Sequence, residues 1–241
     1  MTTDQNSSKA VHPAEHEHRD DTGSGVLRAA VFGMSDGLVS NLALVMGVAG
    51  GGGGSETVVI AGVAGLLAGA FSMAAGEYVS MATQRESMQR QLDLEREHID
   101  RYPEEEQSHL VQLLAGAGLP PATAAEVART VHERAGSARD FHALLELGIV
   151  PGQLGSPVAA ALGSFVAFTV GAVIPLVPWL VLTDALLASM LVSAIALLLV
   201  GGAVTAVTSL GLVAGALRQL AFGAGAAAVT WWIGTLVGRS V

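Results

Sequence analysis

The chain of 241 residues contains no cysteine, which excludes disulfides, thiolate metal sites and cysteine nucleophiles. Charged residues are also scarce: they make up 14% of the sequence, whereas soluble proteins carry about 25%. Aromatic residues reach only 5% but there are 30 glycines, a mixture that favours close helix packing in lipid. The net charge of −9 argues against a nucleic-acid partner. The composition therefore indicates an integral membrane protein.

Five apolar runs are long enough to cross a bilayer, because a helix spans the hydrocarbon core with about 20 residues. They cover residues 26–50, 57–82, 156–180, 184–207 and 217–237. We therefore predict an all-α, polytopic membrane protein with five transmembrane helices, helices 1–2 within 26–83 and helices 3–5 within 153–241. Pro175 and Pro178 are expected to mark the end of the third helix.

Two polar segments accompany these runs. Residues 1–25 are poor in apolar side chains and are predicted to be a disordered cytoplasmic tail. Residues 84–152, between helices 2 and 3, are too long for a loop without structure of its own, so we predict a helical insert. The prolines within it predict short helices at about 84–101, 104–117, 121–136 and 138–147.

The distribution of basic residues predicts the orientation, since Lys and Arg concentrate on the cytoplasmic side of membrane proteins. With five crossings, the side of the tail and the insert carries 11 of the 12 basic residues, and only Arg239 lies opposite. We therefore predict that the N-terminus and the insert are cytoplasmic and that the C-terminus is outside. No apolar leader is visible near Met1, and the Gly- and Ala-rich composition favours a bacterial inner (plasma) membrane, with a vacuolar-type membrane second.

Asp36 and Glu77 are the acidic residues inside the apolar runs and away from their ends, where a carboxylate is costly and therefore suggests function. Met73 lies four residues before Glu77 and shares its helix face. Two carboxylates and a thioether between antiparallel helices would suit Mn²⁺ or Fe²⁺ better than Mg²⁺ or Ca²⁺. The alternative is that the acids stay protonated or bond a hydroxyl such as that of Ser40 or Ser72, with Met73 as a core residue.

Small residues recur at a spacing of four, which allows helix backbones to approach closely in a membrane. The pairs are Gly33 with Gly37, Gly65 with Gly69, and Gly211 with Gly215. Because five helices can hardly enclose a polar path alone, we expect a homodimer with the path along its interface.

The insert contains a second candidate metal site. Glu95 with His98 and Glu106 with His109 each place a carboxylate and an imidazole one helical turn apart, the spacing from which two-metal sites in helical bundles are built. His142 and Glu146, four residues apart, could complete a cage. The alternative is that these acids only stabilise helix starts or form solvated faces.

With these residues identified, the chain resembles the vacuolar iron transporter (VIT) family over nearly all of residues 26–241. The matching segments are "LRAAVFGMSDGLVSNLALVMGVAG" at 27–50, "GLLAGAFSMAAGEYVSMATQRE" at 65–86, "GAVIPLVPWL" at 171–180 and "LRQLAFGAGAAAVTWWIGTLVG" at 217–238. The resemblance implies dimers of five-helix subunits that exchange Fe²⁺ or Mn²⁺ for protons. It places Asp36 and Met73 at metal-coordinating positions in the membrane, with Glu77 as a neighbouring acid.

The family also carries a glutamate-rich cytoplasmic metal-binding insert between helices 2 and 3. The resemblance matches Glu95, Glu106 and Glu146 to family glutamates. His98 and His109 stand where glutamates are usual, and His142 and Ala143 replace paired methionines. Imidazole ligands favour later transition metals and make binding sensitive to pH near 6–7.

We therefore predict a proton-coupled transporter, not an enzyme, that exports cytosolic Fe²⁺ and/or Mn²⁺ and uses no organic cofactor. The alternatives are a membrane-anchored two-metal ferroxidase or metal store, and a metal sensor that does not transport.

Overall fold

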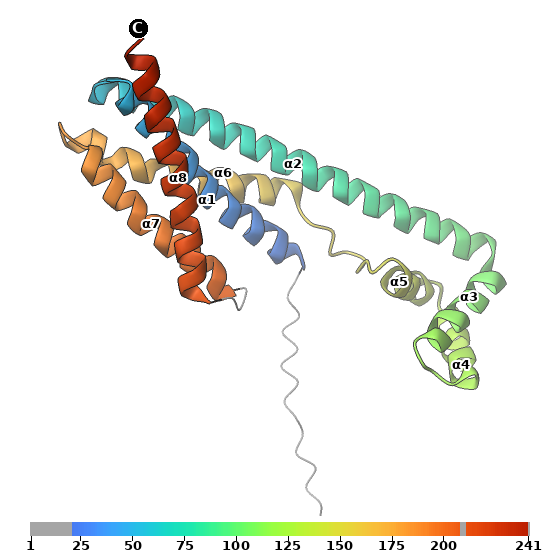
Figure 1. The fold of residues 1–241 in the computed structure, drawn as a ribbon. Coiled ribbons are helices and arrows are strands. Elements are labelled where there is room, and N and C mark those ends of the chain that lie inside the picture. The colour runs from blue at the N-terminus through green and yellow to red at the C-terminus, as the bar shows by residue number, and fades with distance from the viewer. Residues whose placement is uncertain (1–20, 208–210, 241) are drawn as a thin grey trace, which may run out of the picture.

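The computed structural model describes residues 21–207 and 211–240, and these residues form eight helices and no strand (Figure 1). The helices are α1 (Asp21–Gly50), α2 (Ser55–Arg101), α3 (Pro103–Gly116), α4 (Pro121–His132), α5 (Ala135–Glu146), α6 (Pro157–Val181), α7 (Leu186–Val207) and α8 (Leu212–Gly238). The predicted all-α class is confirmed. Residues 1–20 of the predicted tail lie outside the described residues, and α1 begins at Asp21, so residues 21–25 are helical.

The apolar helices form one bundle, in which neighbours in sequence run in opposite directions (Figure 1). Gly25 at the start of α1 lies beside Met81 of α2, whereas Gly65 of α2 faces Leu44 near the end of α1. Helix α6 returns parallel to α1, and α8 does the same on another side of α1. The shared core contains large apolar side chains from four of these helices, among them Leu38, Leu66, Phe168 and Leu197.

Glycines allow α1 to contact its neighbours backbone to backbone. A Cβ on Gly33 would meet the carbonyl oxygen of Ser164 at 2.8 Å, and a Cβ on Gly37 would collide with the Phe168 backbone. At Gly65 and Gly69 of α2 a Cβ would instead meet the side chains of Leu44 and Phe168. Of the third predicted pair only Gly215 is in such a contact, since Gly211 has open space around it. Small residues therefore set the helix spacing, as membrane bundles require.

Four described helices are long and apolar enough to cross a membrane: α1 from Gly25, α2, α7 and α8. The fifth helix of the bundle, α6, is 25 residues long and apolar throughout, and its part before the prolines, Pro157–Val173, is shorter than a full membrane span. The helix predicted at 156–180 is found at Pro157–Val181; it continues through Pro175 and Pro178 and ends three residues after the second proline. Side chains of neighbouring helices support this part: Asn41 donates to the Ala172 carbonyl and Ser189 to the Pro175 carbonyl.

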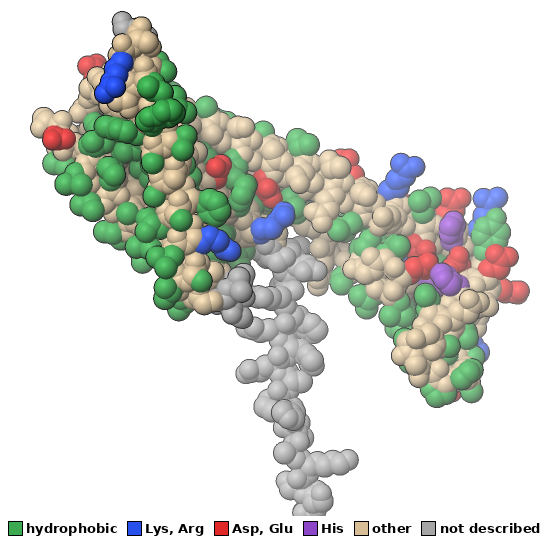
Figure 2. All heavy atoms as spheres, viewed as in Figure 1, with side chains coloured by type: hydrophobic (Ala, Val, Ile, Leu, Met, Phe, Trp, Pro, Cys, Tyr) green, Lys and Arg blue, Asp and Glu red, His purple; other side chains and the backbone are tan. Residues whose placement is uncertain are grey.

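Helix α2 leaves the bundle and continues as a single helix of 47 residues. Its length is about 70 Å at 1.5 Å per residue, more than twice the hydrocarbon thickness. The helix expected at 84–101 is therefore the outer half of α2. It ends at the Tyr102–Pro103 break, where α3 begins. Figure 2 shows histidines and acidic side chains gathered at this far end, whereas hydrophobic side chains cover much of the visible bundle.

Helices α3, α4 and α5 lie together at the outer half of α2. Helices α3 and α4 pack together through Leu110, Leu114, Ala124 and Ala128. Helix α5 packs on α2 through Ala143 against Leu92. Arg139 Nη2 of α5 also donates to both carboxylate oxygens of Asp100 in α2, at 2.7 and 2.8 Å. These contacts bring one face of α5 against the end of α2.

Candidate metal centre

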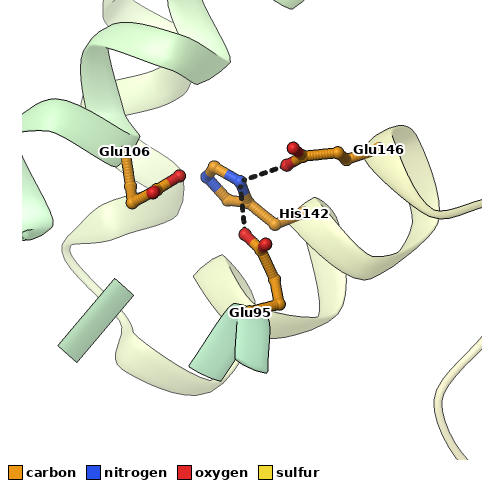
Figure 3. A group of neighbouring side chains, drawn as sticks. All are labelled: Glu95, Glu106, His142 and Glu146. Carbon is orange, nitrogen blue, oxygen red and sulfur yellow. Dashed lines mark ion pairs between the residues drawn. The ribbon is translucent and has the colours of Figure 1, made fainter. Parts of the chain in front are cut away.

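Four side chains from three helices converge where α5 meets α2 and α3 (Figure 3). They are Glu95 of α2, Glu106 of α3, and His142 and Glu146 of α5, and one ligand atom of each lies within 4.8 Å of all the others. All four belong to the six residues that the sequence analysis proposed as insert ligands.

The local packing explains this convergence. Glu95 shares the buried face of α2 with Leu92 and Ile99, at a helical spacing of three and four residues. His142 is fully buried beside Ala143, and Glu146 follows one turn later on α5. The sharp break at Tyr102 then folds α3 back, so that Glu106 faces the same space (Figure 3).

The inner contacts suit a cation better than a hydrogen-bond network. His142 Nδ1 lies 3.2 Å from Glu95 Oε1 and 3.5 Å from Glu146 Oε2. However, Glu95 Oε1 and His142 Nδ1 are buried and neither has a hydrogen-bond partner. Two ligands that bind one ion at about 2.1 Å and at right angles lie roughly 3 Å apart. The two distances from His142 Nδ1 are close to this separation.

Repulsion between the carboxylates of this group also favours a bound cation. Burial raises the pKa of Glu95, and the neighbouring carboxylates of Glu146 and Glu106 raise it further, against smaller opposing effects of His142 and His98. Three carboxylates at this distance disfavour one another's ionisation unless a proton or a metal ion lies between them.

The other two proposed ligands lie at the rim. His98 Nδ1 is 3.9 Å from Glu106 Oε1, and His109 Nδ1 is 3.8 Å from Glu106 Oε2 and 3.7 Å from Glu146 Oε1. Both imidazoles are roughly half exposed, at 57% and 43%. The six side chains thus form one group of four inner and two outer residues; that the group binds metal stays a prediction.

His132 also reaches this group, and the sequence analysis did not propose it. Its Nε2 lies 3.1 Å from His142 Nε2. His132 is the last residue of α4 and has no carboxylate three or four residues away in the sequence. Metal-ligand spacing along one helix therefore does not indicate His132.

The three residues proposed for the membrane path do not meet in one contact group. Among the described residues no hydrogen bond or ion pair joins Asp36 to Glu77 or Met73. Asp36 is exposed on the surface of the single chain, and Met73 packs partly buried against the bundle core. Ser40 donates to the backbone carbonyl of Asp36, at 2.6 Å, and not to its carboxylate.

Glu77 instead meets a basic residue that the sequence analysis did not propose for the site. Its Oε1 lies 3.6 Å from Arg28 Nη2, and the Glu77 side chain is only 17% exposed whereas that of Arg28 is 70% exposed. The antiparallel register of α1 and α2 brings these two residues to the same level.

Comparison with known proteins identifies the family. A family model described as the VIT family matches residues 27–235. A vacuolar iron transporter 1 of Eucalyptus grandis is 30% identical over 190 residues, which cover 78% of this chain and 76% of the relative. The Arabidopsis thaliana protein of the same name is 29% identical over 189 residues, covering 77% and 76%. A vacuolar iron transporter of Acanthamoeba castellanii is 38% identical over 161 residues, covering 66% and 58%. The resemblance read from the sequence is thus confirmed: the chain belongs to the VIT family, whose curated relatives are named as transporters and not as enzymes.

Proposed function

We propose that this protein is a proton-coupled transporter that exports cytosolic Fe²⁺ and/or Mn²⁺. The observation that carries the proposal is the Glu95, Glu106, His142 and Glu146 group, whose Glu95 lies on a helix that continues into the membrane bundle. The relatives named as iron transporters support the same conclusion.

The group on the insert would collect the ion from the cytosol. Carboxylate and imidazole ligands together suit Fe²⁺ and Mn²⁺. Glu95 and Glu77 belong to the same helix, 18 residues or about 27 Å apart along its axis. Helix α2 thus holds the collecting group at a fixed distance from the membrane residues Glu77 and Met73.

Proton coupling would arise at the membrane carboxylates. A divalent ion and a proton compete for the same oxygen atoms, so binding one releases the other. Protons entering from the far side would neutralise Asp36 and Glu77 and release the ion outward. This makes the pH gradient the driving force for export.

The exposed position of Asp36 supports a homodimer. In a lone subunit Asp36 would face lipid, where a carboxylate is strongly disfavoured. Large apolar side chains are exposed on the same bundle: Phe32, one turn before Asp36 on α1, is 63% exposed, and Phe71 of α2 is 65% exposed. A second copy covering this surface would place two Asp36 side chains along a shared path.

Five crossings complete the proposal, with the N-terminus and the insert in the cytoplasm and the C-terminus outside. The alternating directions of α1, α2, α6, α7 and α8 support this count. We place the protein in a bacterial plasma membrane on composition. A vacuolar-type membrane is the second choice, in line with the names of the relatives.

The test is metal uptake into proteoliposomes that contain the purified protein and carry a pH gradient. Asp36→Asn should abolish Fe²⁺ and Mn²⁺ flux, because the path loses its charged oxygen ligand. Asp184→Asn is the matched control, since Asp184 is exposed between α6 and α7 and flux should persist. Flux retained in Asp36→Asn would overturn the path. Metal binding without flux in the unmodified protein would indicate a store or sensor instead.

A further inference from the structure

The contact between His132 and His142 has no part in the function proposed above. The two rings lie edge to face, with centroids 5.3 Å apart and planes at 78°. Their Nε2 atoms are 3.1 Å apart, which is hydrogen-bond distance. His142 is fully buried, so water does not reach its ring.

The two nitrogens of His142 face different surroundings. Nδ1 faces the carboxylates of Glu95 and Glu146 but makes no hydrogen bond to either. Nε2 lies within hydrogen-bond distance of His132 Nε2. A neutral imidazole carries one N–H and one lone pair, and a buried N–H needs an acceptor. A metal ion at Nδ1 requires the proton on Nε2, and the acceptor that this proton finds is His132.

We propose that His132 is a positioning residue for metal binding: it accepts a hydrogen bond from His142 Nε2–H and so holds the His142 tautomer whose Nδ1 lone pair faces the carboxylates. The inference rests on the proposed metal-binding role of the insert. It assigns His132 a role in metal affinity without placing it among the ligands.

The reverse arrangement fits the structure less well. If His142 bound the ion through Nε2, with His132 as a second ligand, the Nδ1–H would be buried without a hydrogen bond of acceptable geometry. A neutral His132 ring has a lone pair with which to accept the hydrogen bond from His142 Nε2–H.

Outer partners of this kind contribute roughly 10- to 100-fold to metal affinity in other proteins. His132→Leu should therefore weaken binding by about this factor while leaving every ligand in place. His132→Gln should restore most of the affinity, because its amide oxygen can accept the same hydrogen bond.

The experiment is a titration of the full-length protein in detergent with Co²⁺, in which the visible absorption of the bound Co²⁺ is measured. Every variant also carries Asp36→Asn, so that the signal comes from the insert. The expected result for His132→Leu is weaker binding with an unchanged spectrum at saturation. In a His142→Met background, His132→Leu should have no effect, because a thioether has no N–H to donate.

Three results would overturn the inference: unchanged affinity in His132→Leu, an altered spectrum at saturation, which would make His132 itself a ligand, or the same loss of affinity in the His142→Met background. Absence of Co²⁺ binding before His132 is changed would overturn the metal site itself, and this inference with it. The two failures are thus distinguishable.

Discussion

Replacing Glu95 by glutamine should make the metal-free insert more stable while removing its response to metal. Glu95 is 8% exposed, and its ligand oxygen lies within 4.8 Å of those of Glu106 and Glu146. Glutamine keeps the shape and removes one of three like charges. The change therefore separates a charge that serves metal binding from one that serves the fold.

The expected magnitude follows from Coulomb's law. At 4.8 Å, the upper limit of the separation between these ligand oxygens, two carboxylates repel by about 0.9 kcal/mol in water and by about 3.5 kcal/mol at an effective dielectric constant of 20. Glu146 is 28% exposed, which screens its share. Because Glu95 also loses its attraction to neighbouring imidazoles, we expect a net gain of about 2 kcal/mol, or roughly 30-fold in an opening equilibrium.

Hydrogen exchange of the full-length protein, measured on peptides from α5, reports this opening equilibrium directly. Metal-free Glu95→Gln should exchange more slowly than the unmodified protein, and added Mn²⁺ should no longer slow it further. Glu97→Gln is the matched control, because Glu97 lies two residues away on the exposed side of α2 and forms an ion pair with Arg101, outside the metal-binding group. Faster exchange in metal-free Glu95→Gln, or an undiminished response to Mn²⁺, would refute the reasoning.

Three further predictions concern other parts of the molecule. Because the pKa of Glu95 is raised, metal affinity measured over a pH series should fall on acidification. The stability of the metal-free insert should instead rise on acidification. The stabilisation from Glu95 is fully present below its ordinary pKa of 4.5 and is lost as pH rises through the raised pKa. Arg28→Gln should lower the metal concentration for half-maximal uptake several-fold, since it removes a cation 3.6 Å from Glu77; an unchanged uptake curve would contradict this. Gly37→Ala should destabilise the bundle by about 1–3 kcal/mol in thermal melts, whereas Gly225→Ala, with open space around it, should not; equal melting of the two would contradict the close helix contact.

The sequence predicted the helical class well because long apolar runs and proline breaks are local signals. Pro103 does end a helix, as expected. The change from apolar to polar residues near 83 does not, since composition can change along a helix without interrupting it. The prolines of α6 lie near its end, as expected, but do not interrupt it. Asn41 and Ser189, both distant in sequence, donate to the Ala172 and Pro175 carbonyls in this part of the helix.

The candidate ligands were predictable as pairs on single helices, but not as one arrangement. Glu95 and His98 are three residues apart, yet Glu95 is buried and His98 is half exposed, because α5 covers only one of the two. His132 and His142 meet only because the chain turns between α4 and α5. The pairing of Arg28 with Glu77 likewise depends on helix register.

The central claim is that metal export is coupled to proton movement, and the most direct test follows both in the same proteoliposomes. With Fe²⁺ or Mn²⁺ on the side of the insert, the account predicts metal movement to the other side together with a matched proton flow in the opposite direction. Metal movement that leaves the internal pH unchanged and does not respond to an imposed pH gradient would contradict it.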